Sequence, residues 1–108
     1  MNEGIKDLLD QIYEGLNNLE KRTNFSELRY KERLFELKTN LDNFRKSENT
    51  DYLKGAIDFF HETAGLYPEV SDAYDTSIWD ANVQVRGKMT TLEELFTKLE
   101  ELYKDLYK

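Results

Sequence analysis

Apolar residues recur every three or four positions along most of this chain, and this spacing strongly limits what it can fold into. In residues 5–19, and again in residues 92–106, the large apolar residues fall on one face of a helix. The first set is Ile5, Leu8, Leu9, Ile12, Leu16 and Leu19, and the last is Leu92, Leu95, Phe96, Leu99, Leu102, Tyr103 and Leu106. Because such a face is stable only against another apolar face, the pattern predicts a bundle of amphipathic helices.

Two further helices are predicted between these. The second carries a narrow, coiled-coil-like seam of Tyr30, Leu34, Leu37, Leu41 and Phe44, widened by Leu28 and Phe35. The third has an inner face of Leu53, Ala56, Ile57, Phe60 and Ala64, and Thr50 or Asp51 can cap its start. Capping boxes are expected at Asn24 with Glu27 before the second helix, and at Thr90 with Glu93, or Thr91 with Glu94, before the last.

Residues 68–86 are less regular. The spacing of Val70, Tyr74, Ile78, Ala81 and Val85 is helical, but the residues between them are poor helix formers. We interpret this stretch as a helix held by tertiary packing. A strand pair over residues 77–89 is the competing interpretation, because residues 82–85 alternate between polar and apolar. The predicted fold is therefore all-α: one domain, residues 1–108, forming an antiparallel helical bundle of four to five helices.

The composition excludes several classes of protein. The chain has 108 residues, which suits one domain, and no cysteine, so disulfides, thiolate metal sites and thiol nucleophiles are excluded. No apolar run approaches the roughly 20 residues of a membrane span, and residues 1–7 do not resemble a signal peptide. We expect a soluble, cytoplasmic protein that does not associate with membranes.

Nothing in the sequence indicates catalysis. His61 is the only histidine, and Asp58-x-x-His61 is half of the acid-x-x-His pattern of di-metal bundles, without the second half. No serine lies in a Gly-x-Ser-x-Gly turn, and the five glycines are too scattered for a phosphate-binding loop. We therefore expect no catalytic residue, no metal and no cofactor, and we give an enzyme or metal protein using His61 the lowest rank.

The charge is unevenly distributed. The net charge is −7, from 22 acidic and 15 basic residues. Residues 55–85 contain no lysine or arginine but hold six acids, interleaved with aromatic residues. Trp79 lies beside Ile78, off the centre of the apolar stripe, which predicts partial exposure. Because aromatic residues are enriched at interfaces and opposite charges steer association, we predict a partner-binding face formed by Glu62, Glu69, Asp72, Tyr74, Asp75, Trp79 and Asp80. The alternative is a solvated acidic surface with Trp79 in the core.

Two other surfaces were weighed. Residues 21–46 carry eight bases against four acids, but the negative net charge disfavours direct nucleic-acid binding. Those bases are better suited to pairing with the acidic segment, within one chain or head to tail between copies. The last helix extends its apolar stripe through Tyr103, Leu106 and Tyr107, so homodimerisation through it is a further alternative.

These observations predict a non-catalytic protein-interaction module. We expect a stoichiometric inhibitor or regulator whose acidic, aromatic face docks on another protein with a basic surface, such as one that handles nucleic acids. Phage anti-defence proteins, immunity proteins and antitoxins include small acidic proteins of this kind, an association of class only. A self-associating structural protein, or a helical scaffold or chaperone, is the alternative.

Overall fold

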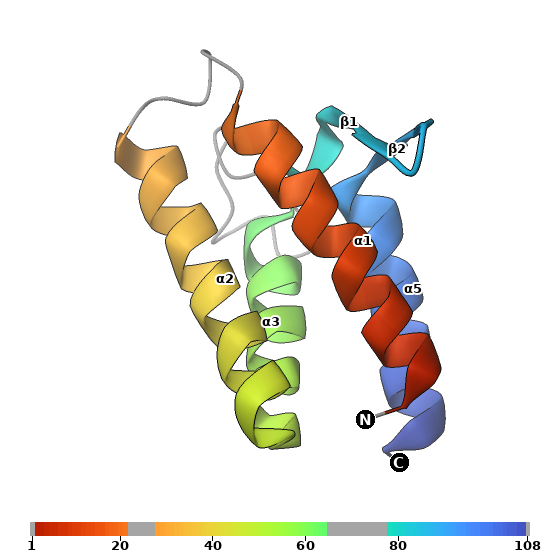
Figure 1. Ribbon diagram of the computed structural model, residues 1–108. Helices are drawn as coiled ribbons and strands as arrows, with labels where there is room; N and C mark the ends of the chain where they lie inside the picture. The colour runs from red at the N-terminus through yellow and green to blue at the C-terminus, as the bar shows by residue number, and fades with distance from the viewer. Residues whose placement is uncertain (1, 22–27, 65–77, 108) are drawn as a thin grey trace.

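Long helices make up most of the structure. The computed structural model describes residues 2–21, 28–64 and 78–107. Its elements, in chain order, are α1 (Glu3–Glu20), α2 (Leu28–Ser47), α3 (Thr50–Thr63), β1 (Asn82–Val85), β2 (Lys88–Thr91) and α5 (Leu92–Leu106). Figure 1 shows α1 beside α5 and α2 beside α3, with both ends of the chain at the same end of the molecule. The prediction of a mostly helical, single domain is confirmed.

Side chains that accept hydrogen bonds from backbone N–H groups determine where three of the helices begin. Asn2 accepts from Gly4 at 2.8 Å and starts α1, and Thr91 accepts from the Glu94 amide at 3.2 Å and starts α5. Of the two expected starts of the last helix, the one at Thr91 is confirmed and the one at Thr90 is wrong. Asn49, in an extended conformation, accepts from the Asp51 amide at 3.0 Å and starts α3. The prediction of Thr50 or Asp51 as that cap is wrong, because Asn49 already satisfies the first free amides.

The predicted apolar stripes form one core. The buried members come from α1, α2, α3, residues 78–79, β1 and α5, and they make a single cluster. In α2 the seam residues Leu34, Leu37, Leu41 and Phe44 are buried, but Phe35 is 73% exposed. The prediction that Phe35 widens this seam is wrong, since a residue next to Leu34 lies about 100° further round the helix. The radius of gyration, 13.2 Å, is typical of a compact domain of this length.

A β-hairpin replaces the last part of the predicted helix at residues 68–86. Val83 pairs with Thr90 and Val85 with Lys88 in an antiparallel register. Arg86 and Gly87 form the turn, both at positive φ (52° and 79°), as a two-residue hairpin loop requires. The all-α prediction is therefore wrong for residues 82–91, and the competing strand pair is confirmed there. Residues 68–77 of the predicted helix lie outside the described part of the chain, as does the Asn24–Glu27 capping box.

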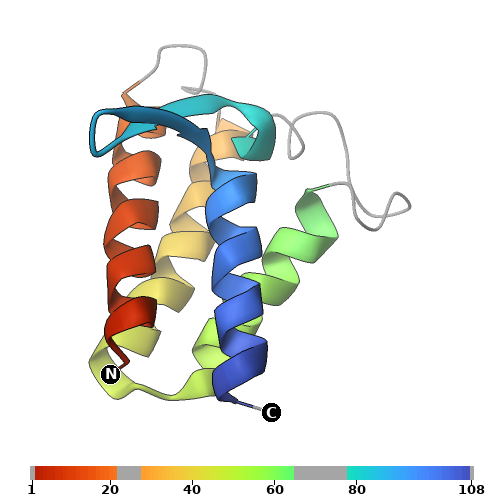
Figure 2. The same cartoon turned by 90° about the vertical axis from the view of Figure 1, so that its right-hand side faces the viewer.

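The hairpin lies across the end of the helices opposite the two termini (Figure 2). Gly15 of α1 allows this, because a Cβ there would lie 3.2 Å from Leu92 and 3.4 Å from Val83. Two polar contacts tie β1 and the turn to α1: Asn18 donates to the Gln84 carbonyl at 2.6 Å, and the Arg86 amide donates to Glu14 at 2.7 Å. Within the described ranges, no helix is both long and apolar enough to cross a bilayer.

Candidate functional site

The structure describes three of the seven residues predicted to bind a partner. Glu62 lies on the exposed side of α3, and Asp80 is exposed in a short helical turn just before β1. Trp79 adjoins Asp80 in the same turn. Glu69, Asp72, Tyr74 and Asp75 lie outside the described residues, so the complete predicted face stays a prediction.

Trp79 belongs to the core. It is 1% exposed, and its ring meets those of Phe60 and Phe96 edge-on, with centroids 5.0 Å away in each case. Its indole Nε1 donates to the Thr63 hydroxyl at 2.8 Å, and that hydroxyl donates to the Phe59 carbonyl at 2.7 Å. The expected partial exposure of Trp79 is therefore wrong, and Trp79 lies in the core, as in the alternative interpretation of this segment. The core provides both an apolar site for the ring and an acceptor for its N–H, so burial leaves no polar group unsatisfied.

Burial of Trp79 fixes the position of its neighbour Asp80, whose side chain faces solvent beside α5. There Asp80 meets Glu93. The pKa of the Glu93 carboxyl is raised above its usual value, first because it shares a hydrogen bond with Asp80, then because of partial desolvation and the charges of Asp80 and Glu94. Two carboxylates from separate parts of the chain thus lie together, and neither has an ion-pair partner among the residues that the structure describes.

Glu93 was absent from the predicted site. It lies in the first turn of α5, where the free backbone amides favour an acidic residue. In the sequence, this local role gives no reason to expect a second role at a binding site. Only the fold-back of the hairpin, which joins β2 directly to α5, brings Glu93 to Asp80. The only available signal was the alternating strand pattern of residues 82–85.

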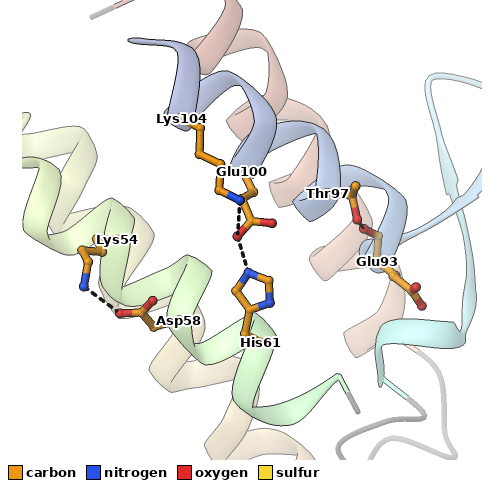
Figure 3. Close-up of polar contacts among 7 residues, drawn as sticks. All are labelled: Lys54, Asp58, His61, Glu93, Thr97, Glu100 and Lys104. Atoms are coloured by element: carbon orange, nitrogen blue, oxygen red, sulfur yellow. Dashed lines mark hydrogen bonds and ion pairs between the residues drawn. The ribbon is translucent and has the colours of Figure 1, made fainter. Parts of the chain in front are cut away.

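His61 and Glu100 form a second polar cluster, between α3 and α5. Figure 3 shows the His61 Nε2 and a Glu100 carboxylate oxygen pointing toward one another, while Lys104 Nζ lies 3.9 Å from the same oxygen. Asp58, the other half of the possible metal motif, instead accepts from Lys54 at 3.3 Å. Among the described residues there is no group of three or more potential metal ligands. The His61 cluster therefore bridges two helices of the fold.

The comparisons with known proteins give no relative. The chain matches no family model, no curated protein and no solved structure.

Proposed function

We propose that this chain is a non-catalytic interaction module that binds a basic surface of another protein through an acidic face. The described part of that face is Asp80 with Glu93, and Glu62 lies on the neighbouring helix α3. The predicted residues Glu69, Asp72, Tyr74 and Asp75 extend the face in the sequence. Such a module acts stoichiometrically, by occluding the basic surface, and its carboxylates stand in for the phosphates of a nucleic acid.

The Asp80–Glu93 pair is the observation that supports this proposal. The pKa of Glu93 is raised by the hydrogen bond that its protonated carboxyl makes with Asp80, then by partial desolvation and by the neighbouring negative charges, so having both carboxylates ionised works against folding. A lysine or arginine of a partner removes that repulsion on binding, so the pair contributes more to a complex than to the free protein. Local arrangements that lower stability without a compensating contact are found most often at functional sites.

The pH dependence of this cost follows from the raised pKa of Glu93. Between the ordinary value, 4.5, and the raised one, the folded chain binds more protons than the unfolded chain, so the free energy of unfolding falls as pH rises. The full cost is present only above the raised pKa. Glu93→Gln should therefore raise the free energy of unfolding at neutral pH, and this gain should vanish below pH 4.5.

The test combines this stability measurement with partner capture. The double variant Asp80→Asn/Glu93→Gln and the wild type are immobilised, and proteins captured from the source cell's lysate are quantified by mass spectrometry. The control, Glu101→Gln/Asp105→Asn, makes the same charge change at exposed positions further along α5. We expect a basic protein that the wild type and the control retain, that the Asp80/Glu93 variant loses, and whose capture weakens as salt rises.

Because the Asp80/Glu93 variant should be at least as stable as the wild type, loss of capture cannot be attributed to unfolding. Equal recovery by all three proteins would contradict the proposed site. Equal loss from both variants would show that only the net charge matters, and failure of the wild type to retain any basic protein would contradict the proposed function.

A further inference from the structure

We propose that a cleft under the β1–β2 turn binds a small organic anion, a carboxylate or phosphate with a short apolar body. The cleft has a volume of about 370 Å³ and lies between α1, the hairpin and the first two turns of α5. This is within the size range of small-molecule sites, about 300–1,000 Å³. The proposal concerns a different surface from the acidic face and does not depend on it.

Basic side chains outnumber acidic ones in the lining of the cleft. Arg86, Lys88 and Lys98 line it, against the single acid Glu94. Arg86 is already neutralised, because its Nη2 lies 2.5 Å from Asp7 Oδ1 and the charges of Asp10 and Glu14 on α1 also act on it. The two lysines are not, and neither has an ion-pair partner within residues 2–21, 28–64 and 78–107.

Lys98 is unpaired for a specific reason. Glu94 precedes it by one helical turn, a spacing that favours an ion pair. The Glu94 carboxylate is instead held by the Thr90 hydroxyl, which donates to it at 2.7 Å. The Glu94 carboxylate is therefore bound to the hairpin and does not form an ion pair with Lys98. Two ammonium groups are left on one cleft of a chain whose net charge is −7, and a bound anion would complement them.

The apolar part of the lining defines the rest of the ligand. Leu95 and Val85 are among the lining residues but are only 2% and 4% exposed, so Met89 provides most of the accessible apolar surface. Met89, on the same cleft, is 63% exposed and can adapt its unbranched side chain to an apolar group. Inorganic phosphate would use the lysines and leave this apolar surface uncovered, so an organic anion complements the cleft better.

The test is an NMR titration of the full ¹⁵N-labelled chain with phenyl phosphate. Benzoate distinguishes a carboxylate from a phosphate head group, inorganic phosphate tests the head group alone, and phenol tests the apolar body alone. We expect phenyl phosphate, benzoate or both to shift the amide signals of residues 85–98, more strongly than inorganic phosphate and phenol. Lys88→Gln and Lys98→Gln should each weaken binding about threefold, as for the loss of one solvent-exposed charge pair.

Lys46→Gln is the matched control, because Lys46 is exposed on α2 and not on the cleft. It should leave the affinity unchanged. Shifts spread over lysines of the whole chain, or equal affinities in all three variants, would overturn the proposed site. Equal binding of phenyl phosphate and inorganic phosphate would overturn the assignment of an apolar body to the ligand.

Discussion

At the scale of single residues, Thr63 illustrates how one hydroxyl determines the position of a large side chain. It is buried, accepts from the Trp79 indole N–H and donates to the Phe59 carbonyl. Thr63→Val keeps the shape of the side chain but leaves the indole N–H without its acceptor. We expect the free energy of unfolding to fall by about 1–3 kcal/mol, the cost of an unsatisfied buried donor. Urea denaturation followed by tryptophan fluorescence measures it.

Thr97→Val is the control for this substitution. Thr97 also donates to the carbonyl four residues earlier, that of Glu93, but it is exposed and no indole depends on it. Its replacement should change stability by less than about 0.5 kcal/mol. If the two variants lose equal stability, the contact with Trp79 contributes nothing beyond the local bond.

Trp79 also shows where sequence reasoning fails at this scale. Its place beside Ile78 follows from helical spacing, but its burial depends on an acceptor 16 residues earlier in the chain. The pairing of Asp80 with Glu93 is non-local in the same way. Local patterns predict which residues of a helix or strand face the core. They do not predict which two polar side chains the fold brings together.

At the scale of elements, the helices were predictable because each carries its own signal. The stripes of α1, α3 and α5, and the Thr91 cap, all follow from residues within a few positions of each other. The hairpin was the harder case, because the spacing from Val70 to Val85 fits a helix while residues 82–85 alternate. A turn of two residues at positive φ decided it. Gly87 suits such a turn, but Arg86 is not one of the residues that typically mark it in a sequence.

Replacing Gly87 or Gly55 with alanine should change the free energy of unfolding in opposite directions. Gly87 has φ +79° with open space around it, so Gly87→Ala meets no clash but must adopt a left-handed backbone. We expect a loss of about 1 kcal/mol in unfolding free energy. Gly55 lies within α3, where a Cβ would make ordinary contact with Asn40 at 3.7 Å. Gly55→Ala should therefore add about 0.5–1 kcal/mol.

Thermal denaturation followed by circular dichroism compares the two glycine variants directly. If Gly87→Ala is neutral, the turn does not hold residue 87 in the left-handed region. A loss on Gly55→Ala would mean that α3 and α2 approach too closely there for a methyl group.

At the scale of the whole molecule, the packing raises the question of whether the fold has one cooperative unit or two. α1 packs mainly on α5 and the hairpin, and α2 mainly on α3, which could divide the domain. The buried side chains of all these elements nevertheless form one cluster, in which Trp79 and Phe96 meet Phe60 of α3. Since that contact crosses between the two helix pairs, we expect a single cooperative unit.

Leu99→Ala tests this expectation. Leu99 is fully buried in α5, and its truncation should lower the free energy of unfolding by about 2–5 kcal/mol. If the domain is one cooperative unit, Leu99→Ala should lower the free energy of opening, measured by hydrogen exchange, equally for the most protected amides of α2 and α3 and for those of α1 and α5. Leu99→Val serves if the alanine variant does not fold, and Phe35→Ala, at an exposed position of α2, should change neither set. Loss of protection confined to α1, α5 and the hairpin would show instead that the two helix pairs open independently.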